Sequence, residues 1–150
     1  LVGSEMCIRD RWGTAEVRSK PLTQDIAIQV AAEVVKVANS EGYPMGKIVG
    51  LEPKDFIDAA DSKKNVEDIK NQMLEQARQA GSASRPSFGQ DVLKRRRTEI
   101  DYLTGFVSQV GKKNNIPTPF CDKVTEVVNS LGVGFETSDK HLDEIERMLN

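Results

Sequence analysis

The segment RPSFGQDVLKRRRTEIDYLTGFV, residues 85–107, ends in a pattern that decides the fold class. After Glu99 the apolar residues recur at the spacing of one buried stripe along an α-helix, namely at Ile100, Leu103, Val107 and Val110. This predicts a helix from Glu99 to about Gly111, with the Glu99 carboxylate on its first turn. The helix dipole favours a negative charge there, and neighbouring backbone N–H groups lack partners within the helix. Such a carboxylate is either purely structural or presented to a ligand by a rigid element.

The same helical spacing recurs on both sides of this segment. It predicts further helices over residues 23–40, 54–60, 66–80, 119–131 and 138–149, and a short one that begins at Ser87 and ends near the basic run of residues 94–97. Thr23 and Thr118 are predicted N-caps, and Pro119 stands at the first helical position, where its missing N–H needs no partner. No stretch longer than five residues shows the sustained alternation of a β-strand. The chain is therefore predicted to be all-α, a helical bundle.

Length and composition describe an ordinary soluble domain. A chain of 150 residues buries roughly 70% of its unfolded surface, enough for one domain with a real core. Its net charge of −2 gives no field that would draw it to nucleic acid or an anionic membrane, and no apolar run approaches the ~20 residues that span a bilayer. Cys7 and Cys121 have no metal-ligand or disulfide spacing, which suits a reducing cytoplasm. The single histidine, His141, is expected at the surface and not as a ligand.

The first residues differ in character from the rest. The opening LVGSEMCIRDR, residues 1–11, is too short and too charged for a secretory signal peptide, and it resembles the translated read-through of a sequencing adapter. We expect it to be a non-native leader, with a disordered native terminus as the alternative. Residues 12–150 are then expected to form the helical domain, and the leader is assigned no function.

Two polar residues at predicted helix starts are candidates for a site. Ser87 fits an N-cap, with Gln90 at capping-box spacing, and a cap alone would stabilise its helix by about 1 kcal/mol. Glu99 fits a surface carboxylate favoured by the helix dipole. The basic run of residues 94–97 is interpreted as a solvated turn, since no aromatic residue is interleaved with it. The sequence has no paired histidines, no Ser/His/Asp set and no glycine-rich phosphate loop, so spacing predicts neither a catalytic residue nor a metal site.

A series of motifs gives these two residues a more specific interpretation. Pro-Ser (86–87), Gln-Asp (90–91), Thr-Glu-Ile-Asp-Tyr-Leu-Thr-Gly (98–105) and Ile-Pro-Thr-Pro (116–119) together resemble the C-terminal domain of ketopantoate reductase, or 2-dehydropantoate 2-reductase. The resemblance is specific over residues 85–119 and extends more loosely from Glu-Val-Arg (16–18) to the C-terminus. It implies an all-α fold like the C-terminal domain of 6-phosphogluconate dehydrogenase. In the whole protein this domain would follow an N-terminal Rossmann domain.

The resemblance also implies an activity and two residue roles. The family reduces the ketone of 2-dehydropantoate with hydride from NADPH, which gives pantoate for pantothenate synthesis. Ser87 would then bind the substrate, and Glu99 would bind the ribose beside the nicotinamide of the cofactor. Both roles suit the residue types, because N–H groups at a helix start bind carboxylates and a carboxylate accepts hydrogen bonds from hydroxyls.

Two parts of that active centre have no counterpart in this sequence. The general-acid lysine of the family lies on a helix before the Glu-Val-Arg segment, and no lysine stands in a matching context, Lys20 included. The glycine-rich turn of the cofactor domain is also missing. We therefore expect an inactive C-terminal fragment of a cytoplasmic reductase that acts on a 2-keto acid. The choice between NADPH and NADH would be made in the missing domain, and a homodimer is left open.

Two other interpretations are kept. One is a stand-alone helical interaction module that dimerises through exposed parts of its apolar stripes; upstream sequence without a G-x-G-x-x-G segment would favour it. The other is a basic nucleic-acid module centred on residues 94–97, which a steep salt dependence of binding would reveal.

Overall fold

The computed structural model of the chain describes residues 19–80, 91–92, 94–136 and 138–150. The longer helices are α2 (Pro21–Ser40), α3 (Pro53–Ser62), α4 (Val66–Ala80), α6 (Thr104–Lys113) and α7 (Pro119–Leu131). Shorter helical turns are η1 (Ile100–Tyr102), η2 (Asp139–Leu142) and α8 (Asp143–Glu146). In this part of the chain the one extended pairing is a single antiparallel bridge between Ile48 and Leu51. The predicted all-α fold is confirmed.

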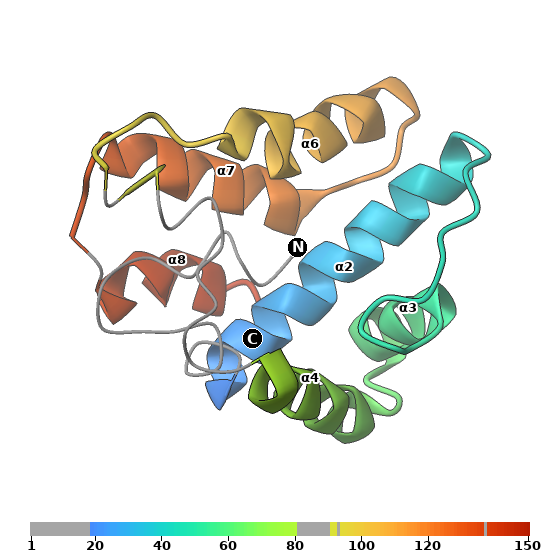
Figure 1. The fold of residues 1–150 in the computed structure, drawn as a ribbon. Coiled ribbons are helices and arrows are strands. Elements are labelled where there is room, and N and C mark those ends of the chain that lie inside the picture. Colours follow the sequence, from blue (N-terminus) through green and yellow to red (C-terminus); the bar gives the residue numbers. More distant parts are fainter. Residues whose placement is uncertain (1–18, 81–90, 93, 137) are drawn as a thin grey trace.

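Helix α2 is the axis of the fold. In Figure 1 it runs between α6 and α7 on one side and α3 and α4 on the other. Ile26 and Val30 join a core formed mainly with α7 and α8, whereas Ile28 and Ala31 join a second core formed with α3 and α4. A helix that presents apolar residues in two directions is buried around most of its circumference. Helix α2 therefore connects the two layers of the bundle.

The start of α2 differs from the prediction. Lys20, not Thr23, is the N-cap residue, and Pro21 occupies the first helical position. Thr23 lies inside the first turn, where its hydroxyl donates to the Lys20 carbonyl at 2.9 Å. The proline ring fixes φ near the helical value and removes an N–H that would otherwise need a partner, so the helix begins earlier than predicted.

The second layer follows the prediction closely. Helix α4 occupies the predicted residues, and α3 extends the predicted residues 54–60 at both ends. The Asp55 carboxylate accepts a hydrogen bond from the Glu52 backbone N–H at 3.1 Å, which satisfies a free donor at the start of α3. Lys70 Nζ lies 2.7 Å from Asp25 Oδ1 and links α4 to α2.

Helix α6 packs against α7 through small side chains. Its buried residues are Thr104, Gly105, Ser108 and Gly111. A Cβ atom added to Gly111 would lie 2.8 Å from the Ile116 carbonyl oxygen, so only glycine fits there without a shift of the backbone. The Thr104 and Thr125 hydroxyls are 2.7 Å apart, and the Thr125 hydroxyl also lies 2.7 Å from the Cys121 carbonyl oxygen. Because Thr125 has one hydroxyl proton, which it donates to Cys121, Thr104 is the donor to Thr125.

The predicted continuous helix from Glu99 to Gly111 is wrong. The segment forms the 3₁₀ turn η1 and then α6, with an irregular backbone at Leu103 (φ −103°, ψ −102°). The predicted apolar stripe is fully buried only at Ile100; Leu103, Val107 and Val110 are half-buried. The close contact of α6 with α7 needs the small residues on the inside, and this places the larger aliphatic residues at the edge of the interface.

The C-terminal segment is helical where predicted but less regular. Residues 138–149 form η2 and α8 in place of one long helix. The Ser138 hydroxyl accepts a hydrogen bond from the Lys140 backbone N–H at 3.3 Å, and Leu142 and Ile145 are buried in the core shared with α7.

The start of α7 is capped by a residue of another helix. Thr118 occupies the predicted N-cap position and Pro119 the first helical position, but the Thr118 side chain makes no capping hydrogen bond. The buried Glu33 of α2 supplies the acceptors. Its Oε1 accepts from the Phe120 N–H at 2.8 Å and its Oε2 from the Cys121 N–H at 2.7 Å. Burial raises the pKa of Glu33 above its ordinary value of 4.5, although these two hydrogen bonds oppose the shift.

Glu33→Ala should lower the free energy of unfolding by about 2–4 kcal/mol, because it leaves two buried N–H donors without partners. Urea denaturation of both proteins measures this difference. Glu75→Ala, which removes an exposed carboxylate of α4, is the control and should change stability by less than about 0.5 kcal/mol. Equal effects of the two substitutions would contradict the capping role.

Glu33 should also make stability depend on pH. Since its pKa is raised in the folded state, the folded chain holds a proton that the unfolded chain has already lost at pH values just above 4.5. The free energy of unfolding contributed by this group is therefore highest at low pH and falls as pH rises through the raised pKa. Glu33→Gln does not titrate there, so the wild type should lose stability relative to this variant as the pH rises above 4.5. If the wild type instead gained stability relative to Glu33→Gln as the pH rises, the assignment would be refuted.

Candidate functional site

The sequence singles out Ser87 and Glu99, and of these two only Glu99 is among the described residues. Ser87 lies outside them, so its role in binding the substrate stays a prediction. Glu99 is exposed and directly precedes η1, and its backbone carbonyl accepts from the Tyr102 N–H at 2.9 Å. In the described part of the chain its carboxylate has no hydrogen-bond or ion-pair partner.

The residues next to Glu99 hold its backbone in place. Ile100 is fully buried in the core shared by α2 and α7. The Asp101 carboxylate accepts from Asn129 Nδ2 of α7 at 2.8 Å and from an Arg97 guanidinium nitrogen at 2.9 Å. A buried anchor and a bonded neighbour therefore fix the segment, while the Glu99 side chain faces solvent.

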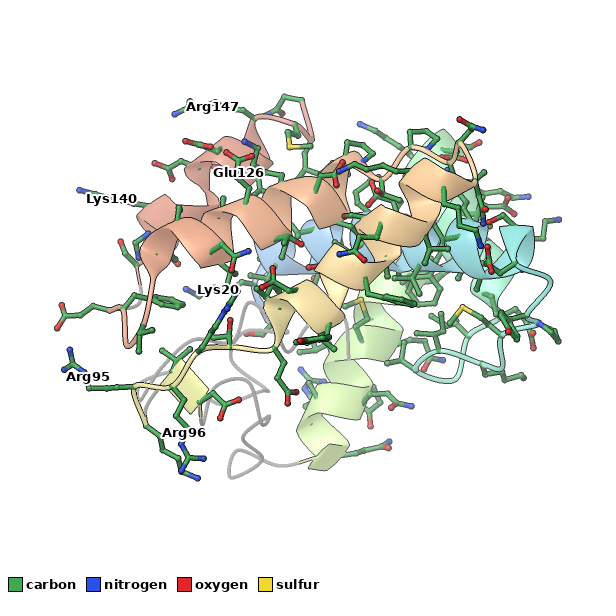
Figure 2. All side chains as sticks on the ribbon, turned by 90° about the horizontal axis from the view of Figure 1, so that it is seen from above. Lys20, Arg95, Arg96, Glu126, Lys140 and Arg147 are labelled. Carbon is green, nitrogen blue, oxygen red and sulfur yellow. The ribbon has the colours of Figure 1, made fainter. Side chains whose placement is uncertain are left out.

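The basic run of residues 94–97 forms an exposed turn, as predicted. Arg95 has a left-handed backbone (φ 54°), and the stem of its side chain packs over Gly134, where an added Cβ would lie 2.9 Å from Arg95 Cγ. In Figure 2 the Arg95 and Arg96 side chains extend away from the ribbon. Lys20 instead forms an ion pair with Asp139, with Nζ 3.1 Å from Oδ1.

Two aromatic residues after Glu99 were not among the predicted site residues. Tyr102 is 84% exposed and Phe106 57% exposed. A signal for them exists in the sequence, because both fall outside the apolar positions predicted for this segment while lying four residues apart. Large rings on a solvent-facing side of a helix often mark a surface that is covered by a partner or a ligand.

The structure also contains a broad groove at a different place. It has a volume of about 940 Å³ and lies where the start of α2, the start of α4 and the C-terminal residues meet. Residues of both charges line it, among them the Asp25–Lys70 ion pair, whereas Glu99 does not.

Residues 19–80, 91–92, 94–136 and 138–150 contain neither a metal-binding cluster nor a membrane-spanning helix. No group of three or more histidine, cysteine, aspartate or glutamate side chains there could hold a metal ion, and no helix there is long and apolar enough to cross a membrane. His141 is half-buried: its ring packs edge-on against Phe135, and its Nε2 lies 2.9 Å from the Glu136 carbonyl oxygen.

Comparison with known proteins gives a consistent result. The family model described as Ketopantoate reductase PanE/ApbA C terminal matches residues 4–132. The 2-dehydropantoate 2-reductase of Lactococcus lactis subsp. lactis is 54% identical over 46 residues, which are 30% of this chain and 15% of that protein. The 2-dehydropantoate 2-reductase of Vibrio cholerae serotype O1 is 40% identical over 53 residues, 35% of this chain and 18% of that protein.

A third relative, the 2-dehydropantoate 2-reductase of Streptococcus pyogenes serotype M3, is 44% identical over 46 residues, 30% of this chain and 15% of that protein. No solved structure matches the chain significantly. Each matched segment thus spans less than a fifth of the relative, whereas the family model covers most of this chain. The chain therefore belongs to the ketopantoate reductase C-terminal family.

Proposed function

We propose that the chain is the C-terminal helical domain of an NADPH-dependent 2-dehydropantoate 2-reductase. The observation that carries this proposal is the family match over residues 4–132, together with relatives that are all named 2-dehydropantoate 2-reductase. In the reaction, hydride from the nicotinamide adds to the ketone carbon of 2-dehydropantoate, and a proton adds to the resulting alkoxide to give pantoate. A stand-alone interaction module is not favoured, because no such protein is among these relatives.

Within this proposal Glu99 binds the ribose beside the nicotinamide. The support is its geometry: an exposed carboxylate without a partner in the described residues, on a segment fixed by Ile100 and Asp101. Ribose hydroxyls are donors that a carboxylate accepts well. Ser87 is proposed to bind the substrate, on the strength of the motif alone.

The remaining parts of the active centre are proposed to lie outside this chain. A match of 46 residues that makes up 15% of the Lactococcus lactis protein implies a length of about 300 residues, twice that of this chain. A Rossmann domain and the general-acid lysine would belong to the other half. Lys20 is not proposed for the proton transfer, since its ammonium group is engaged by Asp139. A cytoplasmic location and a homodimer stay predictions.

The isolated 150-residue chain should fold but should not oxidise NADPH with 2-dehydropantoate. Its helical content by circular dichroism should be high, and the absorbance of NADPH at its nicotinamide band should stay constant. Measured turnover above that of a heat-denatured sample would refute the proposal that half of the active centre lies elsewhere.

In the full-length parent protein, Glu99→Ala should raise the KM for NADPH about tenfold to a hundredfold, because a hydrogen bond to a charged group contributes about 1.5–3 kcal/mol. The melting temperature should change by less than about 2 °C, since the side chain is exposed and unpaired. Steady-state kinetics and calorimetry measure the two effects, with Glu75→Ala as the control that alters neither. A loss of stability at unchanged KM would assign Glu99 a structural role instead.

A further inference from the structure

The Asp101 carboxylate is bonded to two different segments of the chain. Its Oδ1 accepts a hydrogen bond from Asn129 Nδ2 of α7 at 2.8 Å, and its Oδ2 lies 2.9 Å from an Arg97 guanidinium nitrogen. Glu99 lies midway between Arg97 and Asp101 in the sequence. The ion pair therefore closes a five-residue loop around Glu99, residues 97–101, and the bond to Asn129 attaches this loop to α7.

The two bonds constrain the loop differently. The Arg97 side chain is 80% exposed, so solvent screens its ion pair, and a bond between two residues of one loop restricts only the shape of that loop. Asn129 belongs to a regular helix whose other side is buried in the core. The bond from Asn129 is therefore the one that restricts where the loop lies relative to the rest of the domain.

The other contacts of this loop leave its orientation less restricted. Ile100 is fully buried, but apolar contact has no preferred direction. The backbone bonds of the turn are local, from the Tyr102 N–H to the Glu99 carbonyl at 2.9 Å and from the Leu103 N–H to the Ile100 carbonyl at 3.1 Å. A hydrogen bond has a preferred distance and angle, so the Asp101–Asn129 bond adds the orientation that burial of Ile100 does not supply.

We propose that Asp101 is a positioning residue for Glu99. Held by Asn129, it fixes the direction of η1, the turn that Glu99 directly precedes, and with it the place at which the Glu99 carboxylate meets the cofactor ribose. Asp101 acts through the backbone and does not itself touch the cofactor. This inference rests on the proposed function, in which Glu99 binds that ribose.

The first test is kinetic and uses the full-length parent. Asn129→Ala and Asp101→Ala should each raise the KM for NADPH about threefold to tenfold, with little change in kcat, because a displaced Glu99 binds the cofactor less well in the ground state and the transition state alike. Asp101→Asn keeps an oxygen that accepts from Asn129, so it should recover most of the affinity that Asp101→Ala loses. The control is Asn71→Ala, which removes an exposed asparagine of α4 and should change neither constant.

A double-mutant cycle separates positioning from a general effect on the fold. Once the Glu99 carboxylate is absent, its placement no longer matters. The parent with both Glu99→Ala and Asn129→Ala should therefore have the same KM for NADPH as Glu99→Ala alone. Should Asn129→Ala prevent folding, Asp101→Ala combined with Glu99→Ala gives the same comparison.

The second test needs no cofactor and uses the isolated chain. In Asn129→Ala the amide hydrogens of Tyr102 and Leu103, which close η1, should exchange with solvent about tenfold faster than in the wild type. The melting temperature should change by less than about 2 °C, since Asn129 is exposed. Asn71→Ala should leave both quantities unchanged.

Three results would overturn the inference. Increases in KM that multiply in the double variant would show that Asn129 acts independently of Glu99, while the proposed role of Glu99 would stand. Unchanged exchange at Tyr102 and Leu103 would show that η1 is held without Asn129. Failure of the proposed function is distinct: Glu99→Ala would itself leave the KM for NADPH unchanged, and the Asp101–Asn129 bond would then be purely structural.

Discussion

The Glu33 carboxylate joins α2 to α7, two helices that share the main core. It extends from the middle of α2 and accepts hydrogen bonds from the first two free N–H groups of α7, at 2.8 and 2.7 Å. A helix start buried without such acceptors would leave donors unsatisfied at a cost comparable to a whole hydrogen bond each. The contact therefore fixes both where α7 begins and how it lies against α2. The other elements of this layer pack against the pair thus formed.

The placement of Glu99 follows from that arrangement. Helix α7 supplies Asn129, which holds Asp101, and Thr125, which receives the Thr104 hydroxyl. Ile100 enters the core between α2 and α7. The short segment between the basic turn and α6 is thereby fixed on both sides of Glu99, and the carboxylate itself is left to solvent.

Local signals account for the helices that were predicted well. Helix α4 has acidic residues at its start and a regular apolar period, and it occupies the predicted residues. Proline at the first position and threonine before it correctly predict the start of α7. The start of α2 was predicted a few residues too late, because Thr23 and Pro21 are both local signals of a helix start and the structure follows the proline. The family resemblance, which the family model confirms over residues 4–132, likewise follows from residue identities in order along the chain.

The sequence by itself therefore determined the all-α class, most helix positions and the family, because these depend on periodicity, end signals and motifs that are local in the chain. Only the tertiary structure decided that Glu33 caps a helix 86 residues away from it in sequence, although a glutamate within the apolar run of residues 30–35 was a signal of a buried role. It also decided that the small residues of α6 face inward and that Tyr102 and Phe106 face outward. The physical reason is that a helix has several sides with apolar residues, and the neighbour that can approach most closely selects which one is buried.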